Sequence, residues 1–343
     1  MLTRGHQVQI WAAHDSTILA EAAVRGLPHL SLPIGRKTFA GLLALRRAIG
    51  DARPDVINTH SSTDTWLVAL ATLGLRAPPP IVRTRHISAP VPRNLATRWL
   101  YMRATSHIVT TGERLRASLI HTNAFYANRI TSVPTGIDSA KFYPGDKANA
   151  RHALGLDPSA RYIGVVATLR SWKGHLYLLD AFARLVPENP DLRLVIVGDG
   201  PMHEVIVERI KALNLTDSVV LAGRRKDVSV WLRSFDIFCL PSYANEGVPQ
   251  ALVQAMLTAL PVITTDVGSI TEAVSDGRTG RIVAARNVEQ LVAAVRQVLH
   301  DRALAEKLGQ EARVWALQRF ELTTMLTRME DIFRQVIQSR NNR

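Results

Sequence analysis

Short apolar runs recur along the chain between amphipathic stretches. These runs are rich in β-branched residues, and they are apolar at consecutive positions rather than at alternating ones. This pattern is typical of strands covered on both faces, and strands that alternate with helices predict parallel sheets with right-handed crossovers. We expect strands at residues 7–11, 55–59, 80–84, 107–110, 130–133, 162–167, 192–197, 218–221, 236–240, 261–264 and 281–283.

A change in composition near the middle of the chain separates these strands into two sets. Residues 134–138 read PTGID, and a segment with further Pro, Gly and Asp follows up to residue 157. A chain of 343 residues is too long for one typical core and fits two domains of ordinary size. We therefore predict an α/β protein with two Rossmann-like, doubly wound parallel-sheet domains at residues 1–137 and 138–320, which face a cleft at the carboxyl ends of their strands. Residues 321–343 are predicted to form a helix that packs back on the first domain.

The first residues have an unusual order for such a domain. Residues 2–8 resemble the end of a helix, with Gly5 as its C-cap, that runs directly into a strand. A doubly wound domain normally begins with a strand and its loop, so we expect the first domain to lack its first strand, through truncation or a start at an internal methionine. An unprotected sheet edge then predicts lower turnover and a lower melting temperature than in a chain extended upstream.

The composition is that of a soluble globular protein, with 47% hydrophobic residues. No apolar run is long enough to cross a bilayer, and the first residues, MLTRGHQVQIWAAHDS, lack the apolar region of a signal peptide. These features predict a cytoplasmic location. The lone Cys239 cannot form an internal disulfide and is most simply a small buried hydrophobe. Redox chemistry and a structural zinc therefore have no support in the sequence.

The net charge of +13 is concentrated in the first part of the chain. Residues 1–140 contain 16 Lys and Arg against 7 Asp and Glu, whereas residues 141–343 contain 26 against 22. Such an excess attracts anions, including nucleic acid, anionic lipid head groups and phosphorylated glycans. A solvated, arginine-rich surface would give the same count, so charge alone does not choose among these partners.

The most informative stretch is residues 246–254, EGVPQALVQ. It places the Glu246 carboxylate before a Gly-Val-Pro turn and the start of an apolar helix. A carboxylate beside a helix N-terminus offers an acceptor for hydroxyls and a positive dipole end for phosphate, which together suit a sugar nucleotide. An ordinary loop-to-helix junction, capped by Asn245 with Glu246 favouring the dipole, would read the same way.

Three other predicted strands also end in glycine or basic residues. Residues 167–175 read ATLRSWKGH, and the two cations Arg170 and Lys173 are placed to hold a pyrophosphate. Residues 195–201 read VIVGDGP, a turn whose glycines allow close backbone approach, although His203 stands where a dinucleotide fingerprint would have its third glycine. Residues 221–226 read LAGRRK, where backbone groups could read a nucleobase edge and Arg224 or Arg225 stays near phosphate or solvent.

Each of these four strand ends is a weak signal by itself. Solvated loop charges and simple tight turns are the alternatives at every one of them. Their convergence on one edge of the second predicted sheet makes a joint binding site far more probable than any one motif does.

Together the motifs resemble the retaining nucleotide-sugar glycosyltransferases of the GT-B fold, in the large group called family 4 or group 1. The resemblance covers nearly the whole chain and is strongest in RSWKG from Arg170, in GDGP from Gly198 and in EGVP from Glu246. It implies that Arg170 and Lys173 bind the donor diphosphate and that Glu246 contacts hydroxyls of the transferred sugar. The implied donor site comprises Arg170, Lys173, Gly198, Asp199, Gly200, Arg224, Glu246, Gly247, Val248, Pro249 and Gln254, with the backbone of Gly247 and Val248 contacting sugar or phosphate.

One position departs from the family motif. The family has a second glutamate eight positions after the first, which holds the ribose hydroxyls, and this chain has Gln254 there. The amide oxygen can still accept a hydrogen bond, although without charge assistance, so we expect weaker donor affinity rather than loss of transfer. An ordinary polar helix position is the alternative.

The first domain carries its candidates at two strand ends. Residues 81–92 read IVRTRHISAPVP, and the resemblance implies that His86 lies beside the transferred sugar as a positioning group. His60, in VINTHSS, is a second candidate, although a lone histidine is more often a loop or packing residue. The acceptor-side candidates are His60, Arg83, Arg85 and Arg93.

A helix is predicted over residues 94–105, where Arg98 and Arg103 alternate with Leu95, Trp99, Leu100 and Met102. Such a helix can lie on an anionic membrane surface or bind a phosphorylated acceptor. The simpler interpretation is a helix with its apolar side in the core and its arginines in water. We favour that interpretation, with membrane association as a secondary effect.

The resemblance implies a specific chemistry. Arg170 and Lys173 assist departure of the nucleoside diphosphate, the acceptor hydroxyl attacks from the same face, and the anomeric configuration is retained. The implied catalytic residues are Glu246, His86, Arg170 and Lys173, with no metal and no cofactor beyond the nucleotide sugar. The basic first domain favours a phosphorylated or lipid-linked glycan acceptor at the inner membrane face, as in surface polysaccharide or lipopolysaccharide assembly.

Three alternatives compete with this hypothesis. A GT-B sugar-nucleotide epimerase would share the fold and the donor. A nucleotide-sugar-binding or scaffold protein without turnover would agree with Gln254 and with the unusual start. A nucleic-acid binder is suggested only by the charge, and the sequence lacks helix-turn-helix, zinc and stacking-sheet signatures.

Overall fold

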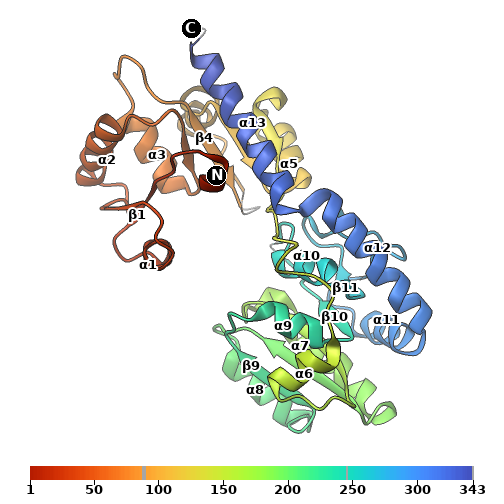
Figure 1. Ribbon diagram of the computed structural model, residues 1–343. Helices are drawn as coiled ribbons and strands as arrows, with labels where there is room; N and C mark the ends of the chain where they lie inside the picture. Colours follow the sequence, from red (N-terminus) through yellow and green to blue (C-terminus); the bar gives the residue numbers. More distant parts are fainter. Residues whose placement is uncertain (87–89, 245, 342–343) are drawn as a thin grey trace. The chain divides into compact units, whose positions relative to one another are not determined.

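The computed structural model describes residues 1–86, 90–244 and 246–341 (Figure 1). These residues form two compact units, which are described separately. Unit 1 comprises Met1–Val133 and Leu326–Arg343, and unit 2 comprises Pro134–Met325.

Unit 1 contains two parallel sheets. The larger has the strand order β3-β4-β5-β6, and the smaller pairs β1 with β2. The strands are β1 Ile10–Ala13, β2 His29–Leu32, β3 Ile57–Thr59, β4 Ile81–Arg85, β5 His107–Thr110 and β6 Ile130–Ser132. The helices are α1 Thr17–Val24, α2 Phe39–Ala52, α3 Ser62–Ala71, α4 Leu95–Trp99 and α5 Glu113–Asn123, joined by most of α13 Leu322–Asn341.

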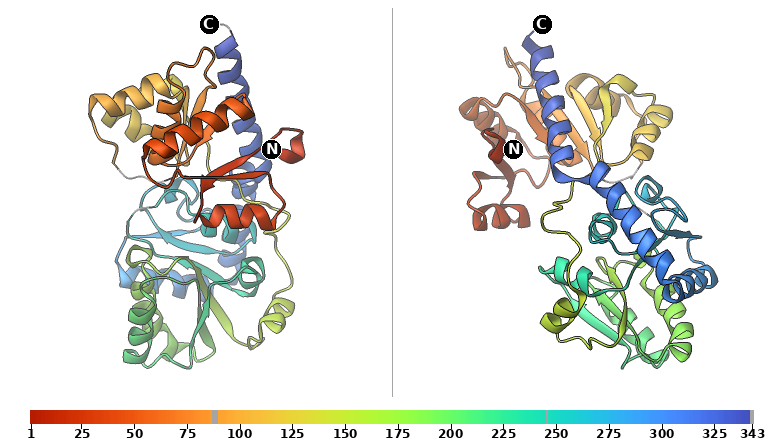
Figure 2. Two further views of the ribbon diagram at one scale, coloured as in Figure 1. Left: turned by 90° about the vertical axis from the view of Figure 1, so that its left-hand side faces the viewer. Right: turned by 45° about the vertical axis from the view of Figure 1, so that its right-hand side comes forward.

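Helix α13 packs along unit 1 beside the N-terminal turn (Figure 2). Glu330 on this helix accepts hydrogen bonds from Arg4 at 3.0 Å and pairs with His6 at 2.9 Å. Near the end of the helix, Arg340 donates to the carbonyl of Ala77. The residues before β1 form a short 3₁₀ turn, Leu2–Arg4, that ends at Gly5 with φ 84°, which confirms the predicted C-cap.

Unit 2 is built on one six-stranded parallel sheet with the order β12-β11-β10-β7-β8-β9. Its strands are β7 Arg161–Val166, β8 Leu192–Val197, β9 Val219–Gly223, β10 Ile237–Leu240, β11 Val262–Thr265 and β12 Arg281–Val283. Its helices are α6 Lys147–Leu154, α7 His175–Leu185, α8 His203–Ala212, α9 Val228–Ser234, α10 Gln250–Leu257, α11 Val288–His300 and α12 Arg302–Phe320. Helices α7, α8 and α11 pack together, as do α6, α9, α10 and α12, so the sheet is covered as in a doubly wound fold.

The core of unit 2 is dense because large aromatic side chains meet small residues on the strands. Phe182, Phe235 and Phe238 are fully buried. A Cβ at Gly164 on β7 would lie 2.0 Å from the Phe235 ring, so this strand position has room for glycine only. Cys239 on β10 is also fully buried, and burial raises the pKa of its thiol, which confirms its role as a small core residue.

The structure confirms the predicted fold class, and every predicted strand occurs within a few residues of its expected position. Two local features differ. Strand β2 was not predicted, because three of its four residues are exposed and its sequence, HLSL, lacks an apolar run. The helix expected at residues 94–105 is present, but it is α-helical only as far as Trp99, and a π-helix, Leu100–Ala104, follows. No helix among the described residues has both the length and the apolar character needed to span a bilayer.

Candidate active site

The candidate site lies where the strand order of unit 2 reverses. From β7 the sheet continues through β8 and β9 on one side and through β10, β11 and β12 on the other. In open α/β sheets the ligand usually lies in a crevice at this position, which here is the carboxyl edge between β7 and β10. The loop after β7 carries Arg170 and Lys173, and the loop after β10 carries Glu246.

A buried carboxylate forms the centre of this site. Glu246 is only 5% exposed, and its Oε1 accepts hydrogen bonds from Lys173 Nζ at 2.6 Å and from Ser242 Oγ at 2.7 Å. No described residue donates a hydrogen bond to its Oε2. The structure therefore brings together two of the predicted residues, and it adds Ser242, whose role the sequence did not indicate because a serine in a loop is too common to be a signal.

Two glycines bring the loops of this site close together. Gly174 ends the 3₁₀ turn Ser171–Lys173 with φ 77°, and a Cβ there would lie 2.0 Å from the carbonyl oxygen of Pro241. Gly268 has φ 63°, and a Cβ there would lie 2.0 Å from the carbonyl oxygen of Glu246. Both positions combine a left-handed backbone with a contact that excludes any side chain. They hold the loops after β7, β10 and β11 against one another and fix the position of Glu246.

Arg170 lies in the same loop as Lys173, but it does not contact Glu246. Its side chain is exposed, and its guanidinium lies 5.7 Å from the centroid of the Trp172 ring. The loop is tied to the β10 side of the crevice by the Tyr243 amide, which donates to the Trp172 carbonyl at 2.8 Å. Arg170 is thus a solvent-facing cation near the Lys173–Glu246 pair rather than a partner of Glu246.

An aromatic cluster supports the loop after β10. The Arg286 guanidinium lies 4.3 Å from the centroid of the Tyr243 ring, and Tyr177 on α7 contacts the same ring edge-on at 5.9 Å. These three residues come from separate parts of the chain, so their sequence spacing gave no indication of the cluster. Its position next to Ser242 restricts the conformations of the loop that carries Glu246.

The GDGP turn after β8 packs against the loop after β7. A Cβ at Gly198 would lie 1.9 Å from the Ala167 carbonyl oxygen, and one at Gly200 would lie 2.7 Å from that of Leu169. The Leu169 amide donates to the Asp199 carbonyl at 3.0 Å, and the Asp199 side chain is exposed. The glycines are therefore explained by the approach of two loops, and Asp199 and Pro201 are the exposed residues of the turn.

The remaining predicted donor residues are less closely engaged. Arg224 is exposed, whereas Arg225 pairs with Asp227 at 3.1 Å and lies over Trp231. Gly247 and Val248 are half-buried, Pro249 is buried, and Gln254 is half-buried on α10. Helix α10 begins after Pro249, which serves as its N-cap without a side-chain hydrogen bond. Asn245, the alternative cap, lies outside the described residues.

His175 is a residue whose environment the sequence did not reveal. It occupies the first position of α7, directly after Gly174, and is 3% exposed. Burial, and secondarily the nearby Lys173 ammonium, lowers the pKa of His175 to about 4. The side chain is therefore neutral at pH 7 and adds no charge beside Lys173.

In unit 1, the two predicted histidines lie together at the carboxyl ends of β3 and β4. The Nδ1 atom of His60 and the Nε2 atom of His86 are 2.9 Å apart, and the rings stack at 5.2 Å with an interplanar angle of 13°. Burial lowers the pKa of both side chains, and the neighbouring His86 ring lowers the pKa of His60 further. The pair can therefore share one proton in a hydrogen bond between the rings.

Two buried arginines of β4 precede His86 in the chain. Arg83 is 4% exposed and its guanidinium lies 4.5 Å from the centroid of the Tyr101 ring, while Arg85 donates to the Tyr101 hydroxyl at 2.8 Å. Among the described residues, the Nε and Nη1 atoms of Arg83 have no hydrogen-bond partner. Burial lowers the pKa of Arg83. Arg93 differs from both, because it is exposed just before α4.

The described residues contain no group of three or more His, Cys, Asp or Glu side chains placed to hold a metal ion. The two candidate edges carry predicted cations of their own. These cations are Arg170 and Lys173 in unit 2, and Arg83 and Arg85 in unit 1.

Comparisons with known proteins agree with this architecture. Residues 146–315 match the family Glycosyl transferases group 1, and residues 1–141 match Glycosyltransferase Family 4. The chain therefore belongs to the family 4, or group 1, glycosyl transferases.

Two curated relatives indicate the range of the family. The chain is 32% identical, over 55% of its length, to the lipopolysaccharide core biosynthesis mannosyltransferase LpsB of Rhizobium meliloti, and 30% identical, over 68% of its length, to the putative glycosyltransferase EpsF of Bacillus subtilis. These alignments span only 57% and 62% of the two relatives. Their activities are therefore a basis for proposals about this chain.

Solved structures share the whole fold at low sequence identity. A glycosyltransferase from Rickettsia africae superposes with a TM-score of 0.87 over 98% of this chain and 92% of the other, at 19% identity. Anabaena Alr3699/HepE in complex with UDP superposes with a TM-score of 0.84 over 95% and 92%, at 20% identity. The arrangement is the two-domain GT-B fold.

Proposed function

We propose that the protein is a retaining GT-B glycosyltransferase that moves a hexosyl group from a nucleoside-diphosphate sugar to a hydroxyl of a glycan or lipid-linked acceptor. The observation that carries this proposal is the buried Lys173–Glu246 pair at the switch point of the unit 2 sheet. Family membership and the fold shared with UDP-bound and UDP-glucose-bound proteins support it.

The pair suits a donor that is both anionic and rich in hydroxyls. An ammonium group has three donors, and the Glu246 contact uses one, so Lys173 retains others for a diphosphate oxygen. The Oε2 atom of Glu246 can accept from a sugar hydroxyl while Oε1 stays bound to Lys173 and Ser242. The pair is nearly neutral before the donor binds, which reduces the cost of burying the carboxylate.

In the proposed reaction the bond between the anomeric carbon and the phosphate oxygen breaks, and a bond to the acceptor oxygen forms on the same face. The acceptor proton passes to the departing phosphate oxygen. Lys173 and the solvent-facing Arg170 stabilise the negative charge that develops on the diphosphate. His86, held by His60, is the proposed positioning group beside the sugar.

The proposed acceptor is a phosphorylated or lipid-linked glycan of cell-surface polysaccharide or lipopolysaccharide biosynthesis, used at the inner face of the cell membrane. The positive charge of residues 1–140 supports an anionic acceptor. Relatives named for lipopolysaccharide core synthesis, and one named for galactosyl transfer to GlcNAc-diphosphoundecaprenol, support this class.

The test begins with a panel of nucleotide sugars, each scored for thermal stabilisation of the protein. The donor that stabilises most is then incubated with lipid-linked and soluble glycans, and release of free nucleoside diphosphate is measured with and without acceptor. Acceptor-dependent release, together with an α-linked product from an α-linked donor by NMR, supports retaining transfer. Isomerised nucleotide sugar without release would instead indicate an epimerase, and unchanged cellular function of Glu246→Ala would indicate a scaffold.

A further inference from the structure

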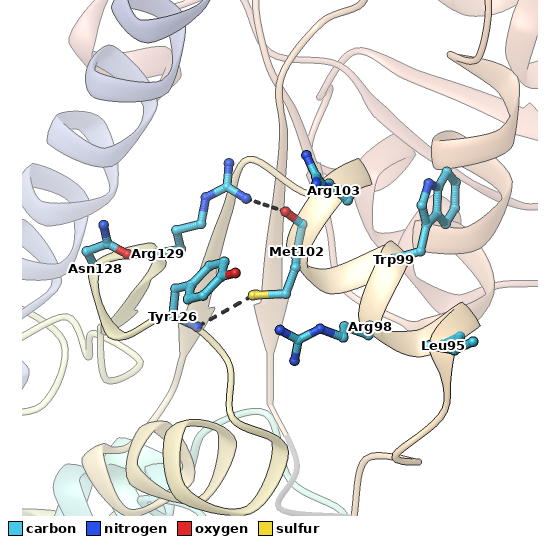
Figure 3. Close-up of a pocket in the computed structure, with 8 residues that line it drawn as sticks. All are labelled: Leu95, Arg98, Trp99, Met102, Arg103, Tyr126, Asn128 and Arg129. Atoms are coloured by element: carbon cyan, nitrogen blue, oxygen red, sulfur yellow. Dashed lines mark hydrogen bonds between the residues drawn. The ribbon is translucent and has the colours of Figure 1, made fainter.

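A cavity of about 640 Å³ lies on unit 1, and none of its lining residues belongs to the histidine pair or to the β4 arginines described above (Figure 3). One wall comes from α4 and the π-helix Leu100–Ala104, and the other from the segment that begins at Tyr126. The lining residues are Leu95, Arg98, Trp99, Met102, Arg103, Tyr126, Asn128 and Arg129. Three of these eight are arginines and none is acidic, so the cavity is strongly positive.

The two walls are joined at Met102. The Tyr126 amide donates to the Met102 sulfur at 3.5 Å, and the Arg129 side chain donates to the Met102 carbonyl oxygen (Figure 3). Met102 itself is buried, so the floor of the cavity is fixed by the core of unit 1. The cavity is therefore a built feature of the fold rather than a gap between exposed side chains.

The π-helix decides where two of the arginines lie. In an α-helix five positions advance by about 500°, so two side chains that are five positions apart, as Arg98 and Arg103 are, point about 140° away from each other around the axis. The wider turn, closed here by the Thr105 amide on the Leu100 carbonyl at 3.0 Å, reduces that rotation. Arg103 is thereby turned toward the side of Arg98, and both line one cavity.

Some exposed arginines of the chain have an acidic partner close by in the sequence. Arg25, Arg302 and Arg334 each pair with a glutamate on their own helix. Among the described residues, Arg98 and Arg103 form no ion pair, although both are exposed. Their charge is available to a ligand.

The rim of the cavity is apolar. Leu95 is 85% exposed and Tyr126 is 55% exposed, at the edges of the two walls. Trp99 stacks on Trp66 at 5.9 Å, and the ammonium of Lys37 lies 5.5 Å from the centroid of the Trp66 ring, which extends the basic and aromatic surface beyond the cavity. Exposed guanidiniums beside an exposed leucine and tyrosine match the phosphates and the first acyl carbons of lipids at a bilayer surface.

We propose that this cavity binds the phosphate of an anionic phospholipid head group and docks unit 1 on an anionic bilayer, with Leu95 and Tyr126 entering the interface. The shared chemistry is a phosphate held by Arg98, Arg103 and Arg129. The three guanidiniums are either unpaired or bound only to a backbone carbonyl, so their positive charge is complementary to a negatively charged surface. This complementarity favours an anionic bilayer as the occupant. Docking of this kind is independent of the transfer reaction, so it can fail while the proposed activity holds.

The test measures binding of the full chain to phosphatidylglycerol vesicles by co-sedimentation, with phosphatidylcholine vesicles as the neutral comparison. The double variant Arg98→Gln/Arg103→Gln is expected to reduce the partition coefficient about 30-fold, or about fivefold for each arginine. The matched control is Arg47→Gln/Arg76→Gln, which removes the same charge from exposed positions of unit 1 and should change binding far less. Leu95→Ser, at a position too exposed to affect folding, should weaken binding severalfold at unchanged charge.

Three results would overturn the proposal. Equal losses in the two double variants would show a diffuse charge effect rather than a site. Equal binding to neutral and anionic vesicles would exclude head-group recognition. Absence of vesicle binding, with saturable binding of glycerol 3-phosphate that depends on Arg98 and Arg103, would assign the cavity to a soluble phosphorylated ligand. Acceptor-dependent turnover on a water-soluble glycan, measured in parallel, keeps failure of docking distinct from failure of transfer.

Discussion

The carboxyl edges of the two sheets carry charge in opposite ways. In unit 2 the central cation, Lys173, is paired with the buried carboxylate of Glu246, and glycines clamp the surrounding loops. In unit 1 the corresponding edge has a histidine pair, and β4 carries the buried Arg83, whose guanidinium has nitrogens without a hydrogen-bond partner among the described residues. The central pair of the unit 2 edge is electrically balanced before any ligand binds, whereas the unit 1 edge has an excess of positive charge.

This difference indicates how specificity is divided between the units. A balanced, rigid edge can discriminate sugar hydroxyls, because Glu246 is held in one position whether or not the ligand is present. A positive edge attracts any anionic group with less geometric demand. We therefore expect unit 2 to determine the donor and unit 1 to favour a negatively charged acceptor.

The largest expected effect is that of Glu246→Ala. It removes the proposed sugar contact and leaves the Lys173 ammonium without its buried partner. We expect a loss of about 10²–10³-fold in kcat, and a decrease on the order of 3 kcal/mol in the free energy of unfolding of unit 2. Steady-state kinetics and chemical denaturation measure the two effects.

Glu204→Ala, at a highly exposed position of unit 2, is the control. Equal losses of kcat and of stability in both variants would contradict the assignment of Glu246 to the site.

The second prediction concerns the cations after β7. Lys173→Met should reduce kcat about 100-fold, because one positive charge no longer stabilises the departing diphosphate. Arg170→Ala should act mainly on KM for the donor, because Arg170 is exposed and does not contact Glu246. Initial-rate kinetics with varied donor separate the two parameters. The same change in both variants would contradict the unequal roles assigned to the two cations.

The third prediction concerns the close contact that Gly174 allows between the loops of unit 2. Gly174→Ala places a Cβ 2.0 Å from the Pro241 carbonyl oxygen at a left-handed backbone position, and we expect a cost of about 3 kcal/mol. Gly277→Ala has a similar φ of 70° with open space around it, so only about 1 kcal/mol is expected. Denaturant titrations of the two variants measure the difference. If both lose the same stability, the contact with Pro241 is not tight in solution.

The fourth prediction uses pH to compare the units. Burial lowers the pKa of His175 in unit 2 and of His107 in unit 1 to about 4. As the pH falls, the unfolded chain binds a proton at each histidine before the folded chain does. Each histidine therefore lowers the free energy of unfolding by up to about 3 kcal/mol between pH 6.5 and pH 4, and it has no such effect above pH 6.5. Hydrogen exchange of each unit at several pH values reports this loss.

Variants at the two positions sharpen the comparison. His175→Leu should remove most of the acid sensitivity of unit 2. His107→Gln can keep the contact with Thr131, but it should remove only part of the sensitivity of unit 1, because the pKa values of His60 and His86 are lowered as well. Undiminished acid sensitivity of unit 2 in His175→Leu would contradict the assignment.

The smallest expected effect is that of Arg83→Met. A buried guanidinium with unpartnered nitrogens contributes little to folding, so an apolar side chain of similar length should change the free energy of unfolding by less than about 1 kcal/mol. Affinity for an anionic acceptor should fall at the same time. Thermal denaturation and acceptor titration measure the two responses. Strong destabilisation would show that Arg83 is a structural residue with partners in solution.

The fold could be predicted from the sequence because many buried strands contain short runs of β-branched residues, such as VIV in β8, Leu192–Val197. Strand β2 was missed because only Leu32 is buried in it. The π-helix was missed because Leu100, Tyr101 and Met102 are all buried and read as an ordinary apolar helix. Neither feature leaves a distinct pattern of apolar positions.

The site was only partly predictable for the same physical reason. Lys173 and Glu246 were found because each follows a strand with glycine beside it, but their direct contact depends on strand order, which the sequence does not state. Ser242, Tyr243 and Arg286 support the site through contacts between distant segments. The GDGP turn was expected to line the nucleotide pocket, and its glycines are explained by contacts with Ala167 and Leu169; a role of Asp199 in donor binding stays a prediction.

The central claim is that Lys173 and Glu246 hold one diphospho-sugar at the β7–β10 crevice. Isothermal titration with UDP, GDP, ADP and dTDP identifies the nucleoside diphosphate that binds, and Lys173→Met is then compared with Lys307→Met, an exposed control on α12. The account predicts at least a tenfold loss of affinity in Lys173→Met and none in Lys307→Met. Equal affinity in the two variants, or binding of none of the four nucleotides, would contradict it.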